Sequence, residues 1–484
     1  MKRISYITCL GLLLLTATSC EKWLDINKDP DNILNAPISL QLSSMTVSTG
    51  FAAGSDLNRY TSLISQQYSG QSTGGETQTQ QYEKYQISPT DANNAFSLLF
   101  ATILNTAENI IKASGTESPH YSGVAKLLKA YVYQISVDTW GDLPYDEAQQ
   151  TSANLNPAYD DDKEIYTKLL SLLDEGIAEV NAATSAQSPG TNSQIYSGTF
   201  STSKDKWVKF ANTLKLRLLL HYSEVDPAFA TQQINALVNS GAQFFEGNAD
   251  NFQVNFLAEQ GRQNPIHQFE VSRAGYLVAN NTIVSMMNKK SDPRRSTYFT
   301  EYPAGSGQYL GAVGGSPASQ NYSKFHTYFR GAQSGSSYTG QAPMRMLTFA
   351  EYNFIRAEAA LRFGSPGNAE EFFKAGIRAS MSDAGVAASV IDDYIKANGT
   401  LAGSNAEKLK QIIEEKFVAN FGIAVEPWTD WRRTGYPAIS VPANAIYPNT
   451  PRSLFYPQSE DDNNRSFPGQ KPNLDVRIFW DTRK

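Results

Sequence analysis

Apolar side chains recur three or four positions apart along most of the chain, which is the spacing that places them on one face of an α-helix. The segments that carry this pattern are residues 96–111, 124–135, 165–180, 207–218, 346–363, 368–382 and 405–421. Consecutive segments are suited to pack in pairs as helical hairpins. The sequence therefore predicts a mainly α fold, in which degenerate tetratricopeptide-like helix hairpins stack side by side.

Between these segments the composition changes to polar and turn-forming residues. Residues 183–204 and 302–343 are rich in Gly, Ser, Thr and Tyr, and residues 427–484 are rich in proline. A loop of about 40 residues is uncommon inside a compact domain and is often functional. We therefore expect one α-rich body over residues 45–484, with a loop-rich face that binds a ligand.

The first residues have the pattern of an export signal. Two basic residues precede an apolar run from Ile4 to Thr16. This run is too short to cross a bilayer core of ~30 Å as a helix, and it fits the apolar part of a secretory signal. The sequence therefore predicts a signal peptide over residues 1–19.

The chain has two cysteines, Cys9 and Cys20, and the first lies inside the predicted signal peptide. Small residues come directly before Cys20, as in the lipobox of bacterial lipoproteins. A mature chain with one cysteine excludes an internal disulfide and a cysteine-based zinc site. We predict that Cys20 is lipidated, and that residues 20–44 form an extended tether between the lipid and the body.

The charge and the aromatic content narrow the class of ligand. The chain has 41 Lys and Arg residues against 47 Asp and Glu residues, a net charge of −6. A nucleic-acid-binding protein usually has a basic patch and a high pI, so this class is disfavoured. Aromatic residues make up 11% of the chain, mostly as 25 Tyr and 24 Phe, which favours a polar, tyrosine-rich surface.

Tyrosines in the polar segments are the candidate ligand-binding residues. A tyrosine ring offers a flat apolar face to the C–H groups of a sugar, and its hydroxyl can form a hydrogen bond. The alternative for each ring is ordinary packing within a loop. The candidates are Tyr82 and Tyr85, in the polar stretch Gly70–Asp91, and Tyr309, Tyr322, Tyr328 and Tyr338, in residues 302–343.

Catalytic motifs give no support for an enzyme. The chain contains no H-E-x-x-H or G-x-S-x-G motif, and its four histidines are far apart in the sequence. Carboxylates beside tryptophans could serve glycoside hydrolysis, which needs two of them about 5–10 Å apart. They are Asp142, Glu147, Glu426 and Asp430. Their spacing does not require catalysis, and we expect neither enzyme activity nor a cofactor or metal.

Other charged residues in the helical segments are better explained by structure. Asp142 can cap a helix after Gly141. Glu351 and Glu358 lie on one helix face, and we expect them to pair with Arg217 or Arg356. The Arg432-Arg433 pair is suited to a structural clamp on carboxylates or carbonyls.

Several segments together resemble the SusD/RagB family of nutrient-binding outer-membrane lipoproteins, specifically its SusD-like branch. They occur in the order found in that family and span nearly the whole mature chain. They are Leu24–Asn32 (LDINKDPDN), Asp138–Ala148 (DTWGDLPYDEA), Lys206–Arg217 (KWVKFANTLKLR), Thr348–Ala360 (TFAEYNFIRAEAA), Trp428–Pro437 (WTDWRRTGYP), Asn464-Arg465 and Val476–Asp481.

The resemblance implies a fold of four tetratricopeptide-like helix pairs with a looped ligand face. It implies a lipoprotein of the outer membrane that faces the cell exterior. It also implies a partner, a SusC-like TonB-dependent transporter, over which the lipoprotein sits as a hinged lid. Family ligands are mostly oligosaccharides, so we expect a protein that captures an oligosaccharide nutrient and passes it to the transporter.

Three alternatives stay open at this point. The same architecture can bind peptides, since some members of the family do. A glycan hydrolase on a helical scaffold and a purely structural interaction scaffold are less favoured. The long loop at residues 302–343 matches none of the family segments, so the sequence does not identify the ligand.

Overall fold

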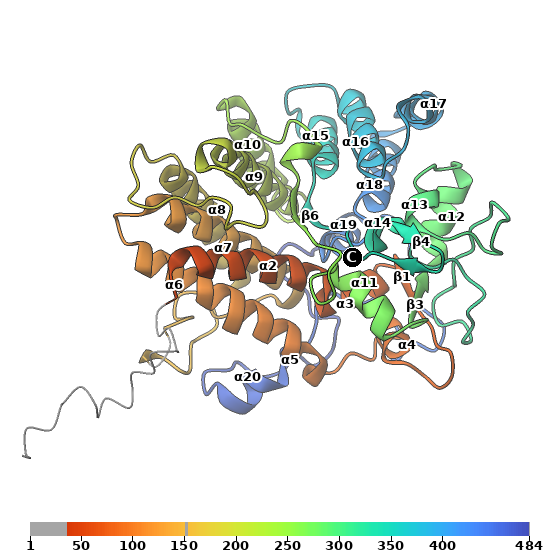
Figure 1. Cartoon of the computed structure of the whole chain (residues 1–484), viewed down its shortest axis with the longest axis horizontal. Helices are drawn as coiled ribbons and strands as arrows, with labels where there is room; N and C mark the ends of the chain where they lie inside the picture. Colours follow the sequence, from red (N-terminus) through yellow and green to blue (C-terminus); the bar gives the residue numbers. More distant parts are fainter. Residues whose placement is uncertain (1–35, 151–152, 484) are drawn as a thin grey trace, which may run out of the picture.

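The computed structural model describes residues 36–150 and 153–483, and helices dominate it (Figure 1). The helices of the first half are α2 (Ile38–Gly54), α3 (Asp56–Ile64), α4 (Gln78–Glu83), α5 (Pro89–Ser97), α6 (Asn105–Ser114), α7 (Pro119–Trp140), α8 (Asp162–Val180), α9 (Phe200–His221) and α10 (Pro227–Asn239). A π-helical turn, Leu98–Leu104, joins α5 to α6.

The helices of the second half are α11 (Pro265–Ser272), α12 (Asn281–Lys289), α13 (Arg295–Tyr298), α14 (Thr327–Arg330), α15 (Phe349–Phe363), α16 (Ala369–Asp383), α17 (Ala388–Asn398), α18 (Asn405–Ala419), α19 (Glu426–Thr434) and α20 (Gln458–Asn463). Every segment predicted to be helical from its apolar spacing contains a helix, although residues 346 and 347 of the segment 346–363 belong to a strand and the segment 405–421 runs two residues past the end of α18. The mainly α fold class is therefore confirmed.

Consecutive helices pack against one another in two groups. In the first group α6 packs on α7, α7 on α8 and α8 on α9, while α15, α16 and α18 form the second group. Figure 1 shows the first group on the left and the second at the upper right, and α9 contacts α15 between them. Helix α7 is buried at almost every position from Tyr121 to Trp140, because helices pack on several of its sides.

Two-stranded antiparallel sheets join segments that are far apart in the sequence. Strand β1 (Tyr68–Gly70) pairs with β3 (Leu277–Ala279), and Tyr68 lies opposite Ala279. The other pairs are β2 (Phe252–Asn255) with β6 (Pro343–Leu347), and β4 (Gln333–Ser334) with β5 (Ser337–Tyr338). The β1–β3 pair places the polar segment after residue 70 beside the segment that contains the long loop.

A buried cluster of charges joins the two groups of helices. Arg217 on α9 donates from Nε and Nη2 to the two carboxylate oxygens of Glu351 on α15, at 2.8 and 2.7 Å. Lys416 on α18 contacts Glu426 at 2.7 Å and Asp430 at 2.8 Å. All five side chains are at most 3% exposed. The predicted pairing of Glu351 with Arg217 is confirmed, and it is a structural pairing.

The second predicted glutamate has a different partner. Glu358 accepts hydrogen bonds from Arg433 (Nη2 to Oε2, 2.8 Å) and from Arg362 (2.9 Å), and not from Arg217 or Arg356. The Arg433 guanidinium comes from α19, so this pair fastens α19 to α15. Arg362 follows Glu358 by one helical turn, a spacing that favours an ion pair on one helix.

The C-terminal segment closes the end of α7. Arg432 donates to the carbonyl oxygens of Arg452 and Asp138, at 2.7 and 2.6 Å. Its guanidinium lies between the rings of Trp428 and Trp480, 3.7 and 4.6 Å from their centroids. The indole of Trp480 donates to the Asp138 carboxylate at 3.0 Å. The structural clamp predicted for Arg432-Arg433 is therefore confirmed.

One predicted boundary differs from the structure. The extended tether was expected to reach residue 44, whereas α2 already begins at Ile38. The apolar pattern did not indicate this helix because part of the face that it buries consists of Thr46, Thr49 and Gly50. The two threonine hydroxyls donate to carbonyl oxygens one turn earlier in the helix.

The remaining N-terminal predictions lie outside the described residues. These are the signal peptide over residues 1–19, the lipidated Cys20 and the first part of the tether. Across residues 36–150 and 153–483, none of the helices is long and apolar enough to cross a membrane.

Candidate functional site

Three polar segments meet on one side of the molecule and form what we call the looped face: residues 70–91, 302–343 and 437–450. Backbone and side-chain hydrogen bonds join them. The Ser319 N–H donates to Gln71 Oε1 at 2.8 Å, and the Gln320 amide donates to the Ser72 carbonyl at 3.0 Å. The Ile446 N–H donates to the Lys84 carbonyl at 3.0 Å. The structure thus brings together the two segments in which candidate tyrosines were predicted and adds a third.

A cavity of ≈ 510 Å³ opens between these three segments, and we call it the loop cavity. Its walls carry hydroxyl, amide and charged groups and no aromatic ring. The lining residues are Ser72, Gly74, Glu76, Gln80, Lys84, Val313, Gly314, Gly315, Ser316, Pro317, Ala318, Ala443 and Asn444. A volume of this size is in the range of ligand sites in proteins, about 300–1,000 Å³.

Glu83 fastens the long loop to α4 behind the cavity wall. Its carboxylate accepts from the Ser69 hydroxyl at 2.6 Å and from the Gly315 N–H at 3.1 Å, and it is 1% exposed. Burial raises the pKa of the Glu83 carboxyl to about 7, although hydrogen bonds from Ser69, Gly315 and Gly70 oppose the shift. The charge state of this buried group therefore changes near neutral pH.

Gly315 is at the closest approach of two of the segments. Its φ is +74°, a conformation that side chains with a Cβ rarely adopt. A Cβ at this position would lie 2.1 Å from the Ala443 carbonyl oxygen. The contact between the long loop and residues 437–450 therefore requires glycine here.

The lining of the cavity includes one ion pair and one residue whose buried hydroxyl is unpaired among the described residues. Lys84 contacts Glu76 at 2.7 Å, and both side chains are partly exposed. The Lys84 hydrogen bond and charge lower the pKa of the Glu76 carboxyl. The buried Ser316 hydroxyl has no hydrogen-bond partner within the described part of the chain. The site can therefore donate and accept hydrogen bonds over a largely uncharged surface.

Three of the six predicted tyrosines are core residues. Tyr82 is 4% exposed and donates to Asp91 at 2.7 Å, and Tyr85 is fully buried beside Thr450. Tyr328 is 7% exposed, and its ring lies 4.4 Å from the ring of Tyr298. Their rings have no free face for a ligand, because neighbouring side chains already cover them.

The other three tyrosines are partly exposed but are not gathered into one platform. Tyr338 lies in β5, where its hydroxyl is 2.8 Å from His326 Nδ1 and its ring faces the Arg330 guanidinium at 4.0 Å. Tyr309 lies 5.2 Å from the Arg295 guanidinium, and Tyr322 is half-buried. Within the described residues, no two of the six tyrosines make an aromatic contact with each other.

The four carboxylates considered for hydrolysis already have protein partners. Asp142 accepts from the Asp162 N–H at 2.9 Å, and Glu147 accepts from the Ala158 N–H at 2.9 Å. Glu426 and Asp430 belong to the buried charge cluster described above. These hydrogen bonds and ion pairs within the chain account for the positions of all four carboxylates.

An acidic group at the start of α8 has the residue types of a metal site. Carboxylate oxygens of Asp142, Asp161 and Asp162 lie within 4.8 Å of one another. Each of these carboxylates also accepts a backbone N–H, and Asp161 is the N-cap of α8. Burial raises the pKa of Asp162 to about 6. Asp142 and Asp161 accept backbone N–H groups at the start of α8, and Asp162 accepts from Phe479 in the C-terminal segment, so hydrogen bonds within the chain account for this group.

The residues that line the loop cavity were not identified from the sequence. All three segments lie in stretches that the sequence indicated as polar or loop-rich, but nothing in it gave a reason to select Glu76, Gln80 or Lys84 within them. The one available signal was the Gly314-Gly315 pair, since adjacent glycines often mark a close backbone contact. Residues 443 and 444 line the cavity because their segment contacts residues far away in the sequence, and no local pattern predicts that contact.

The chain is similar in sequence and in structure to known proteins. A model of a SusD-like family, described as starch-binding and associating with the outer membrane, matches residues 32–457. A chitin-binding SusD homologue from Flavobacterium johnsoniae has a similar structure, with a TM-score of 0.76 and 23% identity over 92% of this chain and 99% of that chain. A SusD-like protein from Bacteroides thetaiotaomicron has a TM-score of 0.76 and 23% identity over 93% and 99% of the two chains. No curated protein matches the sequence.

Proposed function

The chain belongs to the SusD-like family, described as starch-binding and associating with the outer membrane, and we propose that it is a surface protein that binds an oligosaccharide in the loop cavity. The observation that carries this proposal is the cavity itself, which three segments of the looped face build on a rigid helical body. We infer a binding protein without catalytic activity, since the carboxylates considered for hydrolysis are engaged in structural contacts.

The groups in the cavity suit a neutral, hydroxyl-rich ligand. Each sugar hydroxyl can donate one hydrogen bond and accept others, as serine hydroxyls and side-chain amides also do. The exposed Asn444 supplies a side-chain amide, and Lys84 adds a donor whose charge is balanced by Glu76. The Ser72 hydroxyl and Gln80 Oε1 also line the cavity, but they are hydrogen-bonded to Gly74 and Thr77. Tyr309, Tyr322 and Tyr338 remain proposed contacts for a ligand that extends beyond the cavity.

The proposal extends to the partner and the location. We propose that Cys20 carries the lipid anchor and that the body covers a SusC-like TonB-dependent transporter at the outer membrane, as a lid that passes the ligand on. The support for this is the family assignment together with the sequence pattern before Cys20. Co-purification of the chain with a TonB-dependent transporter from its own outer membranes would test the partnership.

Binding of defined oligosaccharides tests the ligand. The full chain, purified in a detergent without a sugar headgroup, is titrated with maltohexaose and with chitohexaose in a calorimeter. We expect binding of at least one, and Lys84→Ala should weaken it by about tenfold, the effect of losing one charged hydrogen bond. Lys396→Ala is the matched control, because Lys396 is an exposed lysine of α17 far from the cavity lining.

The same samples distinguish the alternatives. Binding of a peptide mixture and of neither oligosaccharide would replace the glycan with a peptide ligand. Release of shorter sugars during incubation would contradict the absence of catalysis. Binding that is equal in Lys84→Ala and in the wild type would place the ligand away from the loop cavity.

A further inference from the structure

Helix α2 exposes apolar side chains on the side away from the core. Val47 and Phe51 are each 41% exposed, and Leu257, which follows β2, is 37% exposed. Phe51 is the one phenylalanine among the exposed large apolar side chains of the described residues. All three side chains line one hollow, so they form an apolar patch rather than isolated exposed residues, and such patches often mark binding sites.

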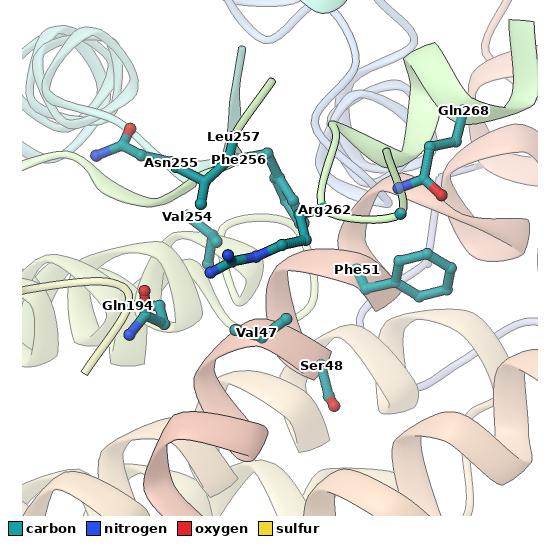
Figure 2. A pocket seen from close by; sticks show the side chains of 11 residues that line it. Val47, Ser48, Phe51, Gln194, Val254, Asn255, Phe256, Leu257, Arg262 and Gln268 are labelled. Atoms are coloured by element: carbon teal, nitrogen blue, oxygen red, sulfur yellow. The ribbon is translucent and has the colours of Figure 1, made fainter. Parts of the chain in front are cut away.

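Phe51 lies in a pocket between α2 and the segment that follows β2 (Figure 2). The pocket has a volume of ≈ 230 Å³. Its apolar part consists of Val47, Phe51, Val254, Phe256 and Leu257. In Figure 2 the Arg262 side chain extends along one side, and Gln268 lies near Phe51 on the other.

The floor of this pocket is held close to α2 by a glycine. A Cβ at Gly50 would lie 2.6 Å from a methyl group of Val254. The absence of a side chain therefore lets β2 pack directly on α2, and the pocket forms beside this contact. The pocket belongs to the rigid part of the molecule.

A second pocket of ≈ 470 Å³ continues the first along α2. Phe51 and Gln268 line both pockets, so they stand between two adjoining hollows. The second pocket has Leu98, Pro265 and Phe269 in its wall. We call the two together the α2 groove. Its elongated form suits a chain of several similar units with Phe51 at its centre.

The charged side chains in the groove are neutralised by one another. Arg262 contacts Glu259 at 2.8 Å, and Arg59 pairs with Asp56. Gln194 and Ser48 carry polar side-chain groups that make no hydrogen bond to other described residues. Gln268 donates its amide N–H to the Gln263 carbonyl at 2.5 Å and leaves its side-chain oxygen as an acceptor. The groove is therefore apolar and hydrogen-bonding but carries no unpaired charge.

From these observations we propose that the α2 groove is a second carbohydrate-binding site, in which Phe51 packs against the C–H face of a neutral oligosaccharide. The choice of carbohydrate as the ligand class rests on the proposed function, whereas the groove itself does not. The two sites share no lining residue. One chain could then hold a polymeric glycan at two points, which raises its avidity without a new contact.

Calorimetry with maltohexaose and chitohexaose tests this proposal on the full chain, in the same detergent. We expect two binding events per wild-type chain and one in Phe51→Ala, whose affinity at the groove should fall about tenfold or more. Val271→Ala is the matched control, because Val271 is 62% exposed on α11 and lines neither pocket. It should bind as the wild type does.

The comparison with Lys84→Ala separates this proposal from the proposed function. Loss of one event in each variant supports both sites. If Phe51→Ala binds as the wild type while Lys84→Ala does not, the α2 groove is overturned and the loop cavity stands. The reverse pattern supports the groove and overturns the loop cavity. If the wild-type chain binds neither oligosaccharide, a carbohydrate ligand in the groove is overturned. The same conclusion follows if the wild type and Lys84→Ala bind a peptide mixture and Phe51→Ala does not.

Hydrogen exchange on the wild-type chain gives a second measurement that does not depend on a variant. Saturation with the oligosaccharide that binds should slow exchange in peptides that cover residues 45–55 and 254–268. Protection confined to residues 70–91 and 302–343 would overturn the groove.

Discussion

At the scale of single residues, Gly315 controls how closely the long loop approaches residues 437–450. Gly315→Ala adds a methyl group 2.1 Å from the Ala443 carbonyl oxygen at a φ of +74°. Such backbone strain costs about 1–3 kcal/mol, so we expect the loop to shift and oligosaccharide affinity to fall about tenfold or more. Calorimetry measures the loss.

Gly305→Ala is the control for this variant. Its φ is +76°, but a Cβ there would meet no atom within 4 Å. Gly305→Ala therefore has a similar backbone strain energy to Gly315→Ala but brings no added methyl group against another atom. Equal loss of affinity in both variants would contradict the role given to the Ala443 contact.

Glu83 gives the looped face a dependence on pH. Its folded pKa of about 7 lies above the ordinary value of 4.5, so the folded state favours the protonated carboxyl. The stability that protonation contributes is complete below about pH 4.5 and is lost as the pH rises through 7. Between pH 4.5 and pH 7 the free energy of unfolding falls by at most about 3 kcal/mol through this group.

Glu83→Gln should remove this contribution, because an amide does not titrate. We expect the free energy of unfolding in urea to fall less between pH 5 and pH 8 in the variant than in the wild type. The other buried carboxyls titrate in both proteins and cancel in the comparison. The same pH dependence in both proteins would show that Glu83 does not titrate in this range.

Tyrosine 328 illustrates how residue type alone misplaces a ligand contact. Because its ring is buried against Tyr298 and lies 4.0 Å from the Arg345 guanidinium, Tyr328→Ala should cost about 3–5 kcal/mol of stability. The half-buried Tyr322 should change stability far less on substitution by alanine. Urea unfolding measures both, and similar small losses would place Tyr328 outside the core.

At the scale of elements, the sequence predicted helices in seven segments with a repeating stripe of large apolar residues, but it did not predict α10, α12 or α17. It missed α2, whose buried side chains include Thr46, Thr49 and Gly50, since small and polar residues carry little of that signal. The apolar periodicity of a segment predicts that the segment is a helix, but it does not predict which other element that helix contacts. The pairing of β1 with β3, which brings the polar segments together, depends on residues about 200 positions apart, and no local pattern records it.

The candidate site could be predicted only as far as its segments. Polar composition selected residues 70–91 and 302–343, and the structure places them side by side. Composition could not select Lys84 or Ser316, because their position depends on contacts made by Glu83 and Gly315. It also favoured tyrosines on chemical grounds, although burial is decided by tertiary packing that the residue type does not encode.

The junction between α9 and α15 depends on one buried cation. Arg217→Met should lower the free energy of unfolding by about 3–5 kcal/mol, because Glu351 would keep its charge in the core without its closest partner. Arg378→Met is the control, since the Arg378–Asp392 pair is more than half exposed and should contribute less than about 1 kcal/mol. Urea unfolding measures both variants. An equal fall in the free energy of unfolding would contradict the role given to the buried Arg217–Glu351 pair.

At the scale of the whole molecule, the proposed attachment to the membrane depends on Cys20, which lies outside the described residues. Cys20→Ala should release the protein from membranes into the soluble fraction, because no other acylation site is proposed. Cys9→Ala is the control, since Cys9 lies in the predicted signal peptide and should not alter attachment. Fractionation of cells that lack the transporter measures the release, and retention of Cys20→Ala would contradict lipid anchoring.

The clamp around Arg432 has a consequence for how the chain is made. The Asp138 carboxylate receives the indole N–H of Trp480, 342 residues later, and its carbonyl receives Arg432. At roughly 5–20 residues per second, synthesis of the intervening chain takes on the order of tens of seconds. During that time the Asp138 side chain and carbonyl lack the indole N–H and the guanidinium that they receive in the complete fold. The clamp can therefore close only after the chain has been made as far as Trp480, which lies four positions before the end of the printed sequence.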